Sequence, residues 1–103
     1  MSEVYKALSD PTRRRILEML RDAPMSAGDI ADRVTISKPT LSGHLNVLKA
    51  ATLVDVTRQG TSLIYRLNTS VLEETIFELM NVFKVGVPRD DGAPKEVRDA
   101  TTK

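Results

Sequence analysis

The sequence predicts a mainly α-helical fold of about five helices with one small β-hairpin. Three observations lead to this fold class. Residues 26–51 hold two amphipathic helical patterns separated by a very short connection. Residues 53–67 alternate apolar and polar side chains on both sides of a turn, as a two-stranded hairpin does. A broad apolar stripe then recurs at helical spacing over residues 71–83.

Two helices are expected before this central region. The first covers residues 2–8 and carries its apolar side chains on one face. Asp10 is the expected N-cap of the second helix, and Pro11 suits a first helical position, where a missing N–H costs little. This second helix is expected to end near Arg21.

Three consecutive arginines, Arg13, Arg14 and Arg15, lie in the second helix. Successive helical residues are rotated by about 100°, so the three side chains fan around the axis and cannot all face one ligand. At least one of them is expected to be a solvated surface residue paired with Glu18 or Asp22.

Residues 26–51 form the centre of the functional argument. Ser26 is the expected N-cap of the first helix in this segment, and Ser37 that of the second. The second helix has an apolar back at i, i+4 and i+7, formed by Leu41, Leu45 and Leu48. Its opposite face carries two cations and several short side chains, namely Lys38, Thr40, Ser42, Gly43, His44, Asn46 and Lys49.

Such a helix, with short hydrogen-bonding residues near its N-terminus, is what enters the major groove in a helix-turn-helix protein. An ordinary amphipathic surface helix is the alternative for either helix alone, but two capped helices joined this closely favour DNA binding. A hairpin that directly follows such a recognition helix is a wing, and Arg58 and Gln59 would lie near its tip. The predicted architecture is therefore a winged helix-turn-helix with a two-stranded wing.

Composition and charge agree with one DNA-binding domain. The chain has 103 residues, a net charge of +1 and no cysteine, which excludes disulfides and thiolate metal sites. Between Arg33 and Arg66 there are five basic residues against the single acid Asp55, which favours binding of phosphate by one face. The sequence contains no apolar run long enough for a membrane span, so we expect a cytoplasmic protein without membrane association.

The motifs identify a family resemblance. Residues 7–17 read ALSDPTRRRIL, residues 36–45 read ISKPTLSGHL, and residues 47–50 read VLKA ahead of the hairpin. The sequence resembles the ArsR family of bacterial winged-helix repressors, particularly its small autorepressor (SdpR-like) branch, over roughly residues 4–84. The resemblance implies a dimeric repressor that places the recognition helix in the major groove and the wing near the minor groove.

One residue departs from the family pattern. Thr52 stands where the family usually has a glycine that closes the recognition helix. Glycine suits a left-handed cap and threonine does not, so either the helix ends differently or the wing leaves at a changed angle.

The last helix is predicted to start with a capping box formed by Ser70 and Glu73. By resemblance, this helix and the first one form a dimer interface, since an exposed stripe so wide would be an aggregation hazard. One-sided packing within a monomer is the alternative. The predicted interface residues are Val4, Tyr5, Leu8, Leu72, Ile76, Leu79, Met80 and Phe83.

Neither metal nor catalysis is predicted. The family's usual metal positions lack cysteine before the recognition helix and histidine in the last helix, so no cofactor is expected, with an atypical oxygen-ligand site at the amino terminus as the open alternative. His44 is the only histidine and is expected to contact DNA or pack locally. The inventory lacks any nucleophile–histidine–carboxylate grouping or phosphate loop, so the chain is not expected to be an enzyme.

The sequence as a whole predicts a homodimeric, sequence-specific transcriptional repressor on an inverted-repeat operator in double-stranded DNA. Residues 1–85 form the DNA-binding and dimerisation domain, and residues 86–103 form a disordered tail. A winged-helix protein-interaction module, or a repressor released by a protein co-regulator or an atypical metal site, is the alternative. The predicted DNA contacts are Ser37, Lys38, Thr40, Ser42, Gly43, His44, Asn46, Arg58 and Gln59.

Overall fold

A computed structural model describes residues 2–86, and the predicted tail falls outside the described residues from residue 87 onward. The fold is mainly helical with a small antiparallel sheet, which confirms the predicted fold class. In chain order the elements are α1 (Ser2–Leu8), α2 (Pro11–Asp22), β1 (Met25–Ser26), α3 (Ala27–Val34), α4 (Lys38–Ala50), β2 (Val54–Gln59), β3 (Ser62–Leu67) and α5 (Thr69–Phe83).

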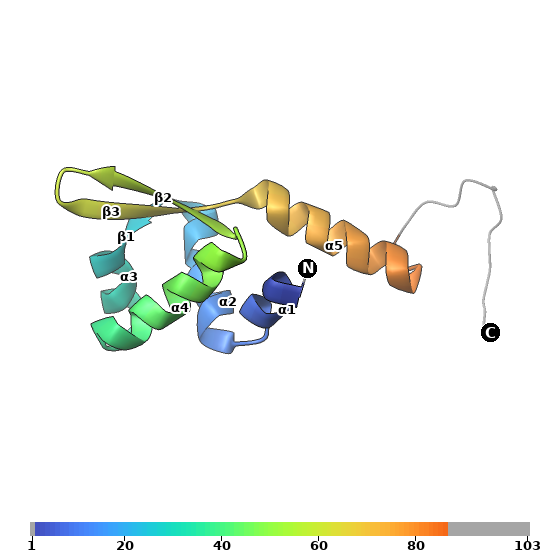
Figure 1. Ribbon diagram of the computed structural model, residues 1–103, viewed down its shortest axis with the longest axis horizontal. Coiled ribbons are helices and arrows are strands. Elements are labelled where there is room, and N and C mark those ends of the chain that lie inside the picture. Colours follow the sequence, from blue (N-terminus) through green and yellow to red (C-terminus); the bar gives the residue numbers. More distant parts are fainter. Residues whose placement is uncertain (1, 87–103) are drawn as a thin grey trace.

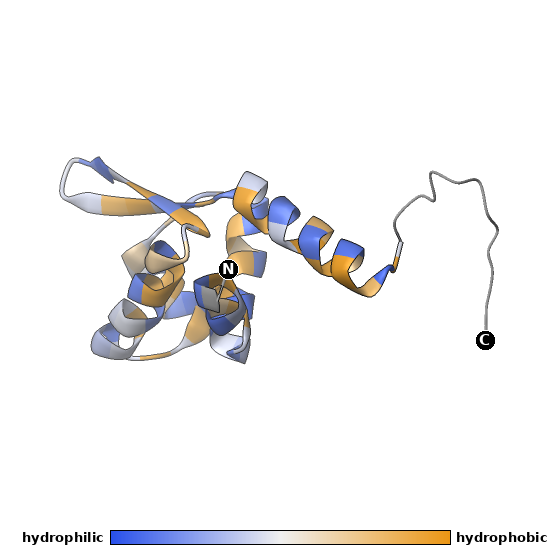
Figure 2. Ribbon diagram, turned by 45° about the vertical axis from the view of Figure 1, so that its right-hand side comes forward, coloured by the Kyte–Doolittle hydropathy of each residue, from blue (hydrophilic) through white to orange (hydrophobic). Residues whose placement is uncertain are grey.

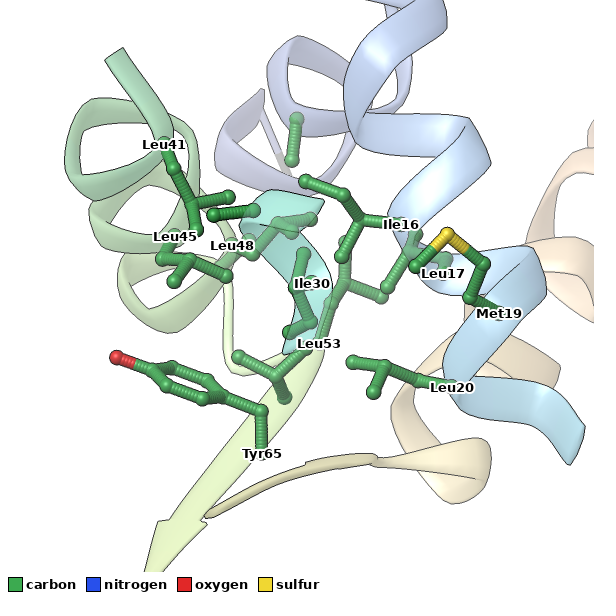
Figure 3. Close-up of a cluster of buried hydrophobic side chains, with 14 of the residues drawn as sticks. Ile16, Leu17, Met19, Leu20, Ile30, Leu41, Leu45, Leu48, Leu53 and Tyr65 are labelled. Carbon is green, nitrogen blue, oxygen red and sulfur yellow. The ribbon is translucent and has the colours of Figure 1, made fainter. Parts of the chain in front are cut away.

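Helices α1 to α4 form a body around one apolar core (Figure 1). The back of the recognition helix α4 points into this core, where Leu48 is fully buried and faces residues of α2 such as Ile16 (Figure 3). Leu53 closes the core from the segment that leads into the wing. Burial of these aliphatic side chains, worth roughly 1.5–3 kcal/mol each, holds α4 on the body with its polar face outward.

The wing is a three-stranded sheet in the order β1-β3-β2, with one more strand than predicted. The extra strand, β1, pairs Met25 with Tyr65 and is too short for any alternation to be visible in the sequence. Strands β2 and β3 are joined through Gly60, whose φ of 63° suits the first central position of a tight hairpin turn. Tyr65 lies in the core, and burial raises the pKa of its hydroxyl.

Three of the predicted helix caps are confirmed. Asp10, Ser26 and Ser37 each accept hydrogen bonds from backbone N–H groups of the first turn that they precede. The predicted capping box of the last helix is wrong, because α5 begins one residue before Ser70. Its N-cap is Asn68, whose side chain accepts a bond from Val71 N at 3.4 Å.

The end of α4 keeps the conformation that glycine normally supplies. Thr52 has a φ of 56°, and its N–H donates to Lys49 O at 2.9 Å. Leu53 N donates to Leu48 O at 3.0 Å, which completes a Schellman cap. The expected change in helix end or wing angle is therefore not needed: the chain keeps the left-handed cap, which is strained in a β-branched residue.

Helix α5 leaves the body on the side opposite the tip of the wing (Figure 1). Of its fifteen residues only Thr75 is buried, and Thr75 Oγ1 donates to Val71 O at 2.9 Å within the same helix. Apolar positions continue along α5 well outside the body (Figure 2). None of the helices within residues 2–86 is long and apolar enough to cross a membrane.

Candidate nucleic-acid interface

The outer face of α4 is a continuous polar surface. Its predicted contact residues Lys38, Thr40, Ser42, Gly43 and Asn46 are all exposed. They lie on the face opposite the three buried leucines, so the core orients them outward. The helix is 13 residues long, or about 20 Å at 1.5 Å per residue, a length that fits across a major groove.

At the N-terminus of α4 two hydroxyl groups are already arranged by the cap. Ser37 Oγ accepts from Thr40 N at 3.3 Å and donates to Thr40 Oγ1 at 3.0 Å. The Ser37 hydroxyl is therefore used in capping, whereas the Thr40 hydroxyl keeps its own proton for an outside acceptor. Lys38 adds a positive charge at this helix end, where the helix dipole also favours anions.

Gly43 stands in the interior of α4, where glycine costs roughly 0.5–1 kcal/mol relative to alanine. A Cβ atom built at this position would meet no atom within 4 Å, so the protomer itself does not require a glycine here. A glycine that lowers helix stability, and that packing within the protomer does not require, is typical of a surface that a binding partner approaches closely.

His44 lies differently from its exposed neighbours. Its side chain is only 18% exposed, and its Nδ1 atom lies 3.2 Å from Arg13 Nη1 and 3.9 Å from Asp10 Oδ2. The ring is therefore turned toward the junction of α1 and α2. Of the two expectations for this histidine, local packing is the one for which the geometry supplies partners.

Asp10 organises this junction. Its Oδ2 atom accepts from Thr12 N at 2.8 Å and from Arg13 N at 3.1 Å at the start of α2. The backbone hydrogen bond from Arg13 is the main cause that lowers the pKa of the Asp10 carboxyl, with smaller contributions from the Thr12 bond and nearby positive charge.

The run of three arginines is divided between two roles. Arg13 donates to Ala7 O and Lys6 O, and Arg14 donates to Leu8 O, so both satisfy carbonyl groups at the C-terminus of α1. Arg14 and Arg15 are exposed to solvent as expected, but within residues 2–86 none of the three arginines pairs with Glu18 or Asp22, and Arg13 and Arg14 bond the backbone instead. Sequence spacing could not reveal this, because it depends on how α1 docks on α2.

Arg15 faces another way. It lines a polar hollow of about 370 Å³ with Arg33 and Thr35, beside the turn that leads into α4. Among residues 2–86, no acidic side chain lines this hollow. The two guanidinium groups add to the positive charge near the start of the recognition helix. In the sequence, Arg15 belonged to the run of three arginines and Arg33 to the basic residues of the central region.

In the wing, Arg58 and Gln59 are exposed at the end of β2, next to the turn. Both side chains are thus available near the tip, as predicted from the sequence. Arg66, on the neighbouring strand, is held across the sheet by a bond from its Nη1 to Thr57 Oγ1 at 3.0 Å. The wing therefore carries two exposed arginines, of which Arg66 is bonded to the sheet and Arg58 lies nearer the tip.

The predicted dimer residues fall into three groups by exposure. Val4 is 6% exposed and packs inside the protomer, so it offers little surface to another chain. Ile76 and Phe83 of α5 and Tyr5 of α1 are 46%, 68% and 41% exposed. The remaining four are half-buried, namely Leu8, Leu72, Leu79 and Met80.

Potential metal ligands are dispersed over the described part of the chain. Within residues 2–86, no three histidine, aspartate or glutamate side chains gather closely enough to hold an ion.

Comparison with known proteins places the chain among transcriptional regulators. The family described as a helix-turn-helix domain matches residues 8–57. The transcriptional repressor SdpR of Bacillus subtilis is 48% identical over 86 residues, which cover 84% of this chain and 96% of that protein. The arsenical resistance operon repressor of Staphylococcus xylosus is 36% identical, over 71% of this chain and 70% of that protein.

Solved structures agree with the sequence relatives. An ArsR-like transcriptional regulator from Rhodococcus sp. RHA1 superimposes with a TM-score of 0.73 and 35% identity, over 81% of this chain and 78% of that chain. The fold, the polar face of α4 and these relatives lead to one conclusion. The chain belongs to the ArsR family of helix-turn-helix transcriptional repressors.

Proposed function

We propose that this protein is a homodimeric repressor that binds an inverted-repeat operator through α4 and the wing. The observation that carries the proposal is the polar face of α4, which is exposed because the opposite face of the helix is buried in the core. Basic side chains lie beside this polar face. Thr40, Ser42, Gly43 and Asn46 lie nearest the bases, and Lys38 and Arg58 contact phosphates or the minor groove.

The proposed dimer is supported by the apolar surface of α5. Phe83 is 68% exposed, a large fraction for an aromatic side chain in a single protomer. At the root of α5 lies a mainly apolar hollow of about 320 Å³. It is lined by four leucines and three charged residues, namely Leu8, Leu17, Leu67, Leu72, Arg14, Glu18 and Arg21. The surface of α5 and this hollow adjoin one another, so a second copy related by a two-fold axis can cover both. Two-fold symmetry then requires half-sites about 10 bp apart or a multiple of that spacing.

We further propose that the protein acts in the cytoplasm, where it meets the DNA, and that it is not an enzyme. Release from DNA by a protein partner is the regulatory mode that we favour, because the chain lacks the cysteine and histidine ligands of the usual family metal sites.

The deciding experiment is fluorescence anisotropy at about 150 mM salt, because phosphate-driven affinities depend steeply on salt. DNA from upstream of the protein's own gene is compared with scrambled DNA, followed by selection from a random duplex library. We expect tight binding to one sequence class only. Failure to select any sequence would favour the alternative of a protein-interaction module.

Two variants separate the roles of wing and helix. Arg58→Ala is expected to weaken binding to all DNA and to lower the salt slope by about 0.9 for each of the two copies. Ser42→Ala is expected to change the preference among operator variants while leaving binding to scrambled DNA unaltered. An unchanged salt slope would remove Arg58 from the contacts, and equal losses on all DNA would remove Ser42 from base recognition.

A further inference from the structure

We propose that Arg13 is a positioning residue for the recognition helix, and that it acts by donating a hydrogen bond to Nδ1 of His44. In this view His44 contacts no base, and instead fixes the rotation of α4 about its axis. The effect on DNA binding rests on the proposed function, whereas the contact between Arg13 and His44 does not.

Two hydrogen bonds to α1 hold the guanidinium group of Arg13 in place independently of His44. Its Nε donates to Ala7 O at 2.9 Å and its Nη2 to Lys6 O at 3.0 Å. These carbonyls belong to the last turn of α1 and have no partner within the helix, although Lys6 O also accepts from Ser9 N and Ser9 Oγ. With two of its nitrogens held, the planar group presents Nη1 at 3.2 Å from His44 Nδ1. One side chain thus joins α1, α2 and α4.

The chemistry of the two groups determines the state of the ring. Arginine has five N–H donors and no acceptor, so Nδ1 must be unprotonated to accept the bond. The neutral ring then carries its proton on Nε2. Asp10 Oδ2, at 3.9 Å from the same nitrogen, lies beyond hydrogen-bond distance and does not compete for the neutral ring.

The three buried leucines of α4 determine which face of the helix is turned to the core, but the hydrophobic effect itself is not directional. A hydrogen bond adds a directional contact that sets the rotation of the helix more finely. A rotation of about 20° would move the ends of side chains some 5 Å from the axis by roughly 2 Å, enough to break a hydrogen bond to a base. The bond from Arg13 to His44 opposes such a rotation next to Gly43, in the middle of the polar face.

The first test needs no DNA. His44 is the only histidine, so a long-range ¹⁵N–¹H NMR spectrum at about pH 8.5 reports its ring alone. We expect the proton on Nε2, and a changed Nδ1 chemical shift in Arg13→Met. Arg14→Met is the matched control, because Arg14 also bonds a carbonyl of α1 but makes no contact with His44. A proton on Nδ1, or an unchanged shift in Arg13→Met, would overturn the inference.

The second test uses two replacements of His44 that keep different ring atoms. The amide of His44→Asn can place an acceptor where Nδ1 stands, whereas that of His44→Gln places a polar group near Nε2. On a duplex selected by the wild-type protein, we expect His44→Asn to bind within about threefold of wild type and His44→Gln about tenfold more weakly. Both variants should bind a shuffled duplex as the wild type does.

The reverse order would show that His44 meets DNA through Nε2 and would overturn the inference. The pair of variants also decides the question if Arg13→Met fails to fold, since neither replacement disturbs the bonds to α1. If the wild-type protein selects no sequence at all, the proposed function fails, while the NMR measurement still decides whether Arg13 holds His44.

Discussion

Helices α4 and α5 are similar in length, 13 and 15 residues, and both carry an apolar stripe, yet the protomer treats them in opposite ways. Helix α4 buries three leucines and exposes short polar side chains. Helix α5 buries only Thr75 and exposes aromatic and aliphatic side chains. The first helix is complete within one chain, and the second has the surface of a helix that lacks a partner.

An apolar stripe alone therefore does not determine whether a helix is buried within its own protomer. The stripe of α4 is matched by residues of α2, α3 and the segment after α4, all in the same protomer. Only the first residues of α5, Val71 and Leu72, pack against that core. Four variants test whether α4 is held by its own protomer and whether α5 is held by a second one.

Leu48→Ala should have the largest effect, because the side chain of Leu48 is fully buried. We expect the free energy of unfolding to fall by about 3 kcal/mol, measured by urea denaturation with circular dichroism at a fixed protein concentration. The loss should be independent of protein concentration, since the cavity lies inside the protomer. A loss below about 1 kcal/mol would mean that α4 is not packed as described.

Phe83→Ala should act on association instead. We expect the dissociation constant of the proposed dimer to rise about 100-fold, because a two-fold interface loses the same aromatic side chain twice. Sedimentation velocity over a range of concentrations measures this change. Val82→Ala is the matched control: Val82 is equally exposed but is rotated by about 100° around α5. Equal effects of the two variants would argue against the predicted face.

Gly43→Ala should change stability and binding in opposite directions. The free protein should gain roughly 0.5–1 kcal/mol, because a Cβ atom at Gly43 has open space and alanine favours the helix. Binding to selected DNA should weaken about tenfold, since the added methyl group stands where DNA approaches. Gly28→Ala, in α3, is the control, with increased stability expected and unchanged binding. Unchanged binding by Gly43→Ala would remove this position from the interface.

Thr52→Gly should have the smallest effect, a gain of about 0.5–1 kcal/mol in the free energy of unfolding. The left-handed φ of 56° strains a β-branched residue, and glycine removes the strain at some cost in chain entropy. Differential scanning calorimetry provides the measurement. Ala50→Gly, two residues earlier and inside α4, should instead lower stability by a similar amount. A loss of stability in Thr52→Gly would show that the hydroxyl bond to Ala51 O matters more than the strain.

Much of the fold could be predicted from local signals. Asp10, Ser26 and Ser37 were predictable as caps because an N-cap acts on the two or three residues that follow it. Strand β1 was not predictable, since two residues carry no periodicity and Tyr65, the partner of Met25, lies 40 residues away. The cap of α5 was misplaced because several neighbouring polar residues could each have served, and the exit of the chain from β3 selected Asn68.

The candidate site shows the same division. The outward polar face of α4 followed from the spacing of its leucines, which the sequence displays directly. The orientation of His44 did not follow from spacing, because it depends on Arg13, which lies 31 residues earlier and is itself held by α1. Likewise, the meeting of Arg15 and Arg33 at one hollow required the docking of α2 against α3.

Residues that are close along the chain, or a motif, were enough to predict the order of the helices and of the two hairpin strands, the polar face of the recognition helix and the family. Strand β1 was the one element that they did not predict. Only the tertiary structure decided which side chains face one another across elements. It also decided that Thr52 keeps a strained glycine-like cap, since packing of Leu53 and the wing outweighs the local preference of one residue. The conformational preference of a single residue amounts to about 1 kcal/mol, and the free energy gained by burying a whole core is larger than this.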